Sequence, residues 1–276
     1  MRESRLKLGA GYVALGLISL LFIIPFIWLI RSSLMDLSQI FVMPPEWIPH
    51  PFHWDNYKRA LTSLPFGTYF VNTLVIVASV MIGTVLTSTI SAFGFSRIRW
   101  KGRDAVFAVL LSSMMLPGAV TLIPSFLGWK ELGFYDTYYP LIVPSFFGGG
   151  IFNIFLLRQF YMSIPKDFDE AAVVDGAGYF QIYWRIILPL SRSAVIVVAL
   201  FTFLGTWNDF MGPLIYLKSD SRFTLALGLQ MFQGSYSAQW DLLMAASAVV
   251  ILPCVLIFLL GQRYFLEGIT LTGLKG

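Results

Sequence analysis

Six long apolar segments alternate with shorter polar segments along the 276-residue chain. The apolar segments cover residues 10–30, 69–92, 105–127, 139–161, 192–217 and 243–262. Each approaches or exceeds the ~20 residues that a helix needs to cross the hydrocarbon core of a bilayer. Irregular backbone cannot face lipid, so these segments are expected to be helical. The pattern predicts an all-α integral membrane protein with six transmembrane helices, organised as a single domain over residues 1–276.

Composition supports this prediction, because 57% of the residues are hydrophobic and only 12% are charged. Soluble domains carry about 25% charged residues. The formal net charge of +4 does not indicate a nucleic-acid partner, because the basic residues adjoin the apolar segments. No small-residue cleavage site follows the first apolar segment, which is therefore interpreted as an uncleaved span. A single cysteine, Cys254, excludes an intrachain disulfide.

The distribution of positive charge predicts the orientation in the membrane. With both termini in the cytoplasm, the outer segments hold 6 of the 19 Lys and Arg residues, and the other 13 lie in the inner segments 1–8, 96–104, 158–192 and 261–276. Cytoplasmic loops of membrane proteins are enriched in Lys and Arg. We therefore expect a multi-pass protein of the cell inner membrane with cytoplasmic termini and outer loops at residues 31–68 and 218–242.

Two local patterns are candidate functional features: a run of three glycines and a pair of histidines. Gly148, Gly149 and Gly150 interrupt the fourth apolar segment, either as close-packing positions or as flexing points. His50 and His53 lie three residues apart in a Pro-rich loop, but no third metal ligand stands out nearby. No metal site is predicted.

The cytoplasmic loop at residues 163–189 has the sequence SIPKDFDEAAVVDGAGYFQIYWRIILP. Asp167, Asp169 and Glu170 suit the first turn of a short helix, because negative charge is favourable at a helix N-terminus. Ser163 is placed to cap that helix.

The same loop is predicted to contain a second short helix, Tyr179 to Ile187, which stops at Pro189. Gly176 or Gly178 is expected to end the first helix in a left-handed conformation. Two helices joined by a glycine elbow indicate a docking element. An amphipathic segment lying on the membrane surface is the alternative.

This loop resembles the Glu-Ala-Ala-x3-Gly-x9-Ile-x-Leu-Pro signature of permease subunits of ATP-binding-cassette (ABC) importers. The matching positions are Glu170, Ala171, Ala172, Gly176, Ile186, Leu188 and Pro189, and Asp175 and Ala177 extend the match. Further along, Phe203-x3-Trp207-Asn208 and the ending from Gln262 to Gly276 resemble carbohydrate permeases of the maltose-transporter MalG type. The resemblance covers nearly the whole chain and implies the type I ABC importer permease fold.

The resemblance also implies a function: transfer of a sugar or oligosaccharide from a periplasmic or extracellular binding protein into the cytoplasm by alternating access. The implied partners are a second, homologous permease in a heterodimer, two ABC ATPase subunits, the solute-binding protein and the lipid bilayer. The chain lacks a Gly-x4-Gly-Lys-Ser/Thr loop for ATP phosphates. It is expected to be non-catalytic and to hold no cofactor, with ATP and Mg²⁺ bound by the ATPase. The residues expected to couple to the ATPase are Glu170, Ala171, Ala172, Asp175, Gly176, Ala177, Leu188 and Pro189.

Two further groups of residues are candidates for contact with the transported solute or its binding protein. Ionisable and polar residues inside a membrane segment face protein or water and are functional candidates. Those on the substrate path are Trp207, Asn208, Asp209, Asn72 and Asn153, with bonding between helices as the alternative role. In MalG-type relatives the last outer loop reaches toward the binding protein, which marks Gln233, Gly234, Ser235 and Tyr236; an aromatic anchor at the membrane interface is the alternative.

Other function classes remain as alternatives. One keeps the importer class but changes the cargo to a polyol, glycerol phosphate or another small solute. Another is an ATP-independent secondary transporter, for which internal repeats and ionisable residues near the bilayer centre would be expected. No convincing repeat is present. A membrane anchor without a transport role is disfavoured by the interrupted spans.

Overall fold

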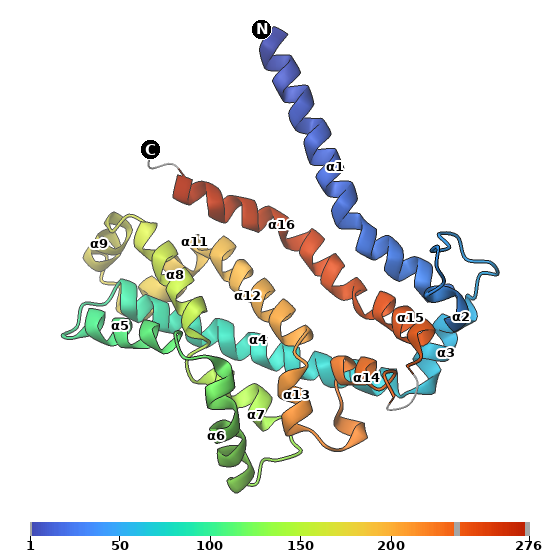
Figure 1. Ribbon diagram of the computed structural model, residues 1–276. Helices are drawn as coiled ribbons and strands as arrows, with labels where there is room; N and C mark the ends of the chain where they lie inside the picture. The colour runs from blue at the N-terminus through green and yellow to red at the C-terminus, as the bar shows by residue number, and fades with distance from the viewer. Residues whose placement is uncertain (1, 235–237, 274–276) are drawn as a thin grey trace. The chain divides into compact units, whose positions relative to one another are not determined.

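The computed structural model describes residues 2–234 and 238–273, and these residues form helices and connecting loops without a β-strand (Figure 1). The chain divides into two compact units. One comprises residues 1–67 and 228–252, and the other comprises residues 68–227 and 253–276.

The first unit is built on α15 (Trp240–Val250), which packs against α1 (Arg2–Ser33), α2 (Leu37–Ile40) and α3 (Asp55–Ser63). Asn56 is buried, and its side-chain amide donates hydrogen bonds to the carbonyls of Ser33 (3.1 Å) and Met35 (2.9 Å). The Arg59 guanidinium lies 3.8 Å from the buried carboxylate of Asp241. These contacts attach the loop after α1 to α3, and α3 to α15.

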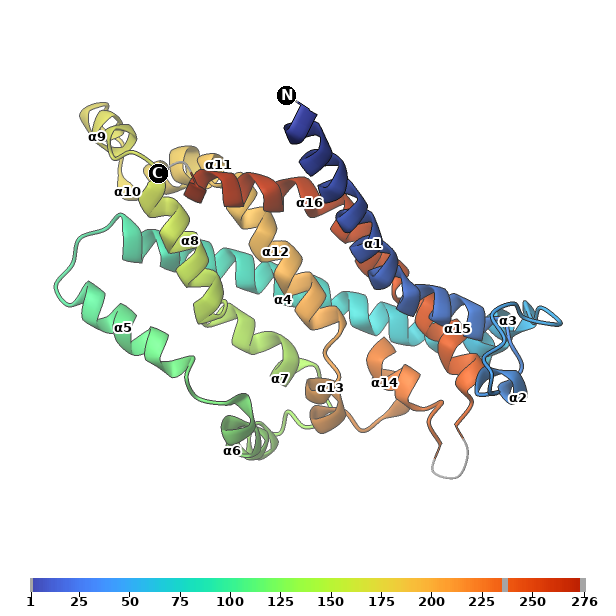
Figure 2. The same ribbon diagram turned by 45° about the horizontal axis from the view of Figure 1, so that its top comes forward.

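The second unit contains most of the helices. They are α4 (Phe66–Ser96), α5 (Arg103–Ser113), α6 (Gly118–Glu131), α7 (Tyr139–Ile142), η1 (Val143–Phe146), α8 (Ile151–Ser163), α9 (Asp167–Val174), α10 (Tyr179–Ile182), η2 (Tyr183–Ile187), α11 (Leu188–Leu190), α12 (Arg192–Trp207), α13 (Met211–Tyr216), η3 (Asp220–Arg222), α14 (Leu225–Gln230) and α16 (Leu252–Gly273). In both views α9 lies at the end of α8, near the loop that joins α4 to α5 (Figures 1 and 2).

The described residues contain four to six candidate membrane spans, and hydropathy predicts six. Among the described residues four segments are long and apolar enough to cross a bilayer: Gly11–Ser33, Phe66–Ser96, Tyr139–Ser163 and Trp240–Tyr264. Two bent helix pairs bring the number to six when each pair counts as one span: α5 with α6, bent by 94°, and Tyr179–Leu190 with α12, bent by 77°.

The predicted spans 105–127 and 192–217 are nevertheless not continuous helices. The first breaks between Ser113 and Gly118, where Pro117 has extended backbone and precedes α6. The second ends at Trp207, and α13 starts only at Met211. Hydropathy reports whether a segment partitions into lipid, but it is insensitive to a break whose polar backbone groups are satisfied by neighbouring protein.

The glycine triplet in the fourth span has a structural reason. Gly148, Gly149 and Gly150 have φ values of 125°, 61° and 82°, which L-residues with side chains rarely adopt. A Cβ on Gly149 would lie 2.6 Å from the carbonyl oxygen of Thr84. The backbone before α8 therefore passes directly against α4, which supports the close-packing interpretation over that of a flexing point.

Candidate coupling site

The helix α9 begins at Asp167, with its acidic first turn as predicted. The carbonyl of Lys166 accepts the amides of Asp169 (2.8 Å) and Glu170 (3.0 Å), and no side chain caps this end. The prediction that Ser163 caps α9 is wrong. Ser163 ends α8, and its hydroxyl donates to the carbonyl of Phe160 at 2.7 Å. Three residues between the two helices place Ser163 too early to reach the first amides of α9.

Gly176 ends α9 in the left-handed conformation, with φ 83°. Its amide donates to the carbonyl of Val173 (3.0 Å), and the amide of Ala177 donates to the carbonyl of Ala172 (2.9 Å). This pair of bonds is the Schellman arrangement, in which a glycine satisfies the last carbonyls of a helix. Gly178, the other predicted candidate, has φ −79° and instead precedes α10.

The second helix of the loop is longer than predicted. It runs from Tyr179 through α10, the π-helical η2 and α11 to Leu190, and the bend comes at Ser191. Pro189 is the middle residue of α11, so the helix continues past Ile187 and ends one residue after the proline. The π-helical segment covers Tyr183–Ile187 and so includes Ile186 of the signature.

The signature residues divide into two groups by exposure. Ala172 is buried, and Ala177, Ile186 and Leu188 pack against the same core cluster, which contains Phe93, Leu157 and Tyr161. Glu170, Ala171, Asp175, Gly176 and Pro189 are exposed. One face of α9 thus anchors the helix to the unit, and the remaining surface is available to another molecule.

The exposed side of α9 is apolar as well as acidic. Val174 is 87% exposed, and Val173 and Phe168 are also exposed. Phe180 on the following helix is 74% exposed. The coupling residues predicted from the sequence do not include Val173. Exposed apolar groups that are rimmed by charge are typical of surfaces that bind another protein.

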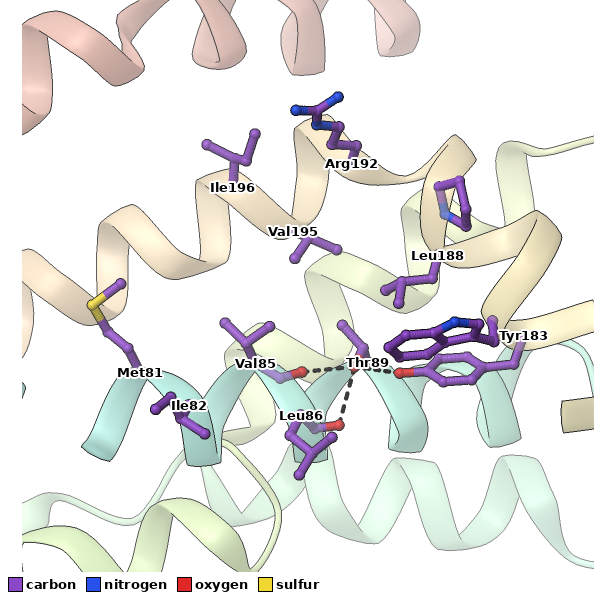
Figure 3. Close-up of a pocket in the computed structure, with 12 residues that line it drawn as sticks. Met81, Ile82, Val85, Leu86, Thr89, Tyr183, Leu188, Arg192, Val195 and Ile196 are labelled. Atoms are coloured by element: carbon purple, nitrogen blue, oxygen red, sulfur yellow. Dashed lines mark hydrogen bonds between the residues drawn. The ribbon is translucent and has the colours of Figure 1, made fainter. Parts of the chain in front are cut away.

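An apolar groove of about 890 Å³ lies beside the second half of the signature (Figure 3). Val85 and Leu86 of α4 line one side, and Leu188 and Val195 line the other. The hydroxyl groups of Thr89 and Tyr183 are 2.9 Å apart and join α4 to η2. The helix that carries the second half of the signature therefore contacts α4 through η2.

Arg97 is a site residue that the sequence analysis did not identify, since the residue was used only to orient the chain. Its side chain is 4% exposed and lies 2.9 Å from a carboxylate oxygen of Asp169. The two residues are 72 positions apart. The available signal was the charge itself, but nothing in the sequence distinguishes Arg97 from its neighbours Arg99, Lys101 and Arg103.

The substrate-path candidates on the predicted fifth span lie at the C-terminal end of α12 and in the break that follows it. Trp207 is 3% exposed and stacks on Phe203, with ring centroids 5.3 Å apart. Asn208 donates to the carbonyl of Leu204 at 2.8 Å, and Asp209 accepts the amide of Gly212 at 3.1 Å. Trp207 is the last residue of α12, and Asn208 and Asp209 lie in the break before α13 begins at Met211.

The other two candidates also bind backbone groups. The Asn72 amide donates to the carbonyls of Ser221 and Phe223, both at 2.9 Å. The Asn153 amide donates to the carbonyl of Gly149 at 2.8 Å. Each holds an irregular segment in place, as expected for polar residues that satisfy backbone within a membrane.

Two loops of the second unit are joined at Asp136, whose carboxylate accepts the amides of Lys218 (2.9 Å) and Ser219 (3.0 Å) and the Ser219 hydroxyl (2.5 Å). Burial favours the neutral carboxyl, but these hydrogen bonds and the nearby Arg222 outweigh it and hold the pKa of Asp136 at about 2. Of the candidates for contact with a binding protein, Gln233 and Gly234 are exposed. Ser235 and Tyr236 lie outside the described residues.

Comparisons with known proteins identify the family. Residues 83–270 match the family of the binding-protein-dependent transport system inner membrane component. The trehalose/maltose transport system permease protein MalG of Thermococcus litoralis is 32% identical over 279 residues and covers 100% of both chains. The sn-glycerol-3-phosphate transport system permease protein UgpE of Yersinia pestis is 30% identical over 258 residues, 91% of each chain.

The fold has a solved counterpart in a bacterial ABC transporter involved in the import of the acidic polysaccharide alginate. The TM-score is 0.82 at 22% identity, over 96% of this chain and 98% of that chain. The helix order, the signature on α9 to α11 and the family match all indicate the same family. The chain therefore belongs to the family of binding-protein-dependent transport system inner membrane components, the permease subunits of ABC transporters.

Proposed function

We propose that this chain is the non-catalytic permease subunit of an ATP-driven importer of sugars or oligosaccharides, and that α9 is the surface on which its ATPase docks. The observation that carries the proposal is the division of α9 by exposure: Ala172 is buried and anchors the helix, while Glu170, Ala171 and Val174 are exposed. A surface fixed on one side and apolar on the other can receive force from a bound partner.

The partners follow from this assignment. Two ABC ATPase subunits would supply the ATP and Mg²⁺ sites, a homologous permease would complete a heterodimer, and an extracytoplasmic binding protein would deliver the solute. Both termini would then lie in the cytoplasm with α9. Gln233 and Gly234, which are exposed, would be part of the surface toward the binding protein.

A carbohydrate is the cargo that the relatives favour, since the Thermococcus protein is a trehalose/maltose permease. The Yersinia relative, a glycerol-3-phosphate permease, supports glycerol phosphate as the alternative. The substrate-path candidates of this chain do not separate the two, because Asn72, Asn153, Asn208 and Asp209 all bind backbone groups.

The test is purification of the tagged chain from its native membrane, with its companions identified by mass spectrometry. Recovery of an ATPase, a second permease and a binding protein is expected, and the ligand of that binding protein identifies the cargo. A matched pair of variants tests the docking surface. Val174→Asp on α9 should lose the ATPase, whereas Met43→Asp, at a position 86% exposed on an outer loop, should retain it. Recovery of the chain alone, active in ion-driven uptake, would contradict the proposal.

A further inference from the structure

Arg97 is a buried cation with three acceptors on two other elements. One nitrogen, Nη1, lies 2.9 Å from the Asp169 carboxylate on α9. The other, Nη2, donates to the carbonyls of Tyr161 (2.6 Å) and Ile164 (2.8 Å), at the end of α8. Burial of a charge is unfavourable unless it is paired and hydrogen-bonded. The position of Arg97 just after α4 therefore fixes three helix ends against one another.

Arg158 makes the reciprocal connection from α8 to α4. Its Nε donates to the carbonyl of Phe95 in the last turn of α4, at 3.1 Å. Its guanidinium also lies over the ring of Phe107 on α5, 4.3 Å from the centroid. The last carbonyls of a helix lack partners within it, and cations are favourable there. Arg97 just after α4 and Arg158 within α8 thus each donate to carbonyls at the end of the other helix.

The helix α9 depends on such a connection to transmit force. It has only eight residues, and isolated helices of that length are not stable in water. Its buried contact is through Ala172, a small side chain. The bond between Arg97 and Asp169 is the ionic link between α9 and the end of the second span.

We propose that Arg97 and Asp169 are the positioning pair that makes α9 move as one body with α4 and α8. The inference rests on the proposed function, since the force on α9 would come from a docked ATPase. Asp169 attaches α9, and the carbonyl contacts of Arg97, together with Arg158, hold α4 and α8 to each other. Displacement of α9 is then passed to two spans and is not absorbed by the loop.

Three variants separate this role from a general effect of charge. Asp169→Asn removes the ionic attachment of α9 but leaves the contacts between α4 and α8. Arg97→Lys keeps the charge but cannot supply the planar fork that serves several acceptors. Arg99→Ala is the control, since Arg99 is exposed and has no ion pair among the described residues.

The measurement is the distance between spin labels at Lys166→Cys, just before α9, and Ile90→Cys on α4, in a Cys254→Ser background. The sample is the complex purified with its ATPase, before and after trapping with MgATP and vanadate. The wild-type distance should stay the same in both states. In Asp169→Asn and Arg97→Lys the distribution of label-to-label distances should broaden and shift on trapping. In Arg99→Ala this distribution should be the same as in the wild type. Transport-coupled ATP hydrolysis should fall about tenfold in the two test variants, within the usual range of coupling between sites.

Failure of this inference can be distinguished from failure of the proposed function. A wild-type distance that shifts on trapping overturns the inference, as does an Asp169→Asn variant that cannot be told from wild type while both retain the ATPase. Absence of an ATPase from the wild-type complex contradicts the proposed function itself, before any variant is compared.

Discussion

The amide of Ala177 donates a 2.9 Å hydrogen bond to the carbonyl of Ala172, across the left-handed turn at Gly176. Both alanines pack in the core cluster. The bond closes the C-terminus of α9 and sets the direction in which the chain leaves it. The signature therefore contains a glycine because the turn after α9 needs positive φ.

Gly176→Ala is expected to reduce transport, because an L-residue in this conformation costs about 1–2 kcal/mol. The site offers no steric obstacle, since nothing lies within 4 Å of an added Cβ. Gly178→Ala is the matched control, with equally open space but φ −79°. Uptake by membrane vesicles measures both variants. Equal uptake by the two would contradict a conformational role for Gly176.

Gly149→Ala is expected to destabilise the purified protein by about 2 kcal/mol or more, since strain from positive φ adds to overpacking against α4. Gly94→Ala, also in the second unit but with no atom within 4 Å of an added Cβ, should have little effect. Thermal unfolding in detergent measures the difference. If Gly149→Ala kept its stability but lost transport, the flexing interpretation would be favoured instead.

Asp136→Asn should loosen the loop at residues 217–222 at neutral pH. The folded-state pKa of Asp136, about 2, is below its unfolded value. Its contribution to stability is thus complete above the unfolded pKa of about 3.9 and is lost as pH falls from about 4 through about 2. Hydrogen exchange at the amides of Lys218 and Ser219 reports this loss. In the asparagine variant the protection of these two amides should be lower than in the wild type at pH 7. That protection should not fall further between about pH 4 and about pH 2. A pH response like that of wild type would exclude Asp136 as its source.

Trp207→Ala should lower stability by about 3–5 kcal/mol, the cost of removing a large buried aromatic side chain. Trp207 stacks on Phe203 and meets Phe70 edge-on at 6.1 Å between centroids. Trp207→Phe keeps part of this packing and should lower the stability by less than Trp207→Ala does. Thermal unfolding is compared with solute affinity in vesicle uptake. An unchanged melting temperature with a weakened solute affinity would instead indicate that Trp207 contacts the solute.

Much of the coupling site follows from local sequence. The acidic first turn of α9, the left-handed glycine and the helix after it depend on neighbouring residues, and the fixed spacing from Glu170 to Pro189 carries that information. The boundaries were less accurate at Ser163 and Pro189. Whether a serine caps a helix or ends one, and whether a proline stops a helix or enters it, depends on backbone bonds that residue type does not specify.

The class of protein, the apolar segments and the loop that carries the signature can be predicted from the sequence, because hydropathy and fixed spacing are properties of consecutive residues. The contact of Arg97 with Asp169 depends on packing, as do the bonds of Asn72, Asn153, Asn208 and Asp209 to backbone groups at irregular segments. A polar side chain in a membrane protein needs a partner, and that partner can be any group that the fold brings near. Arg97 and Arg99 are alike in sequence, and only packing buries one and leaves the other in solvent.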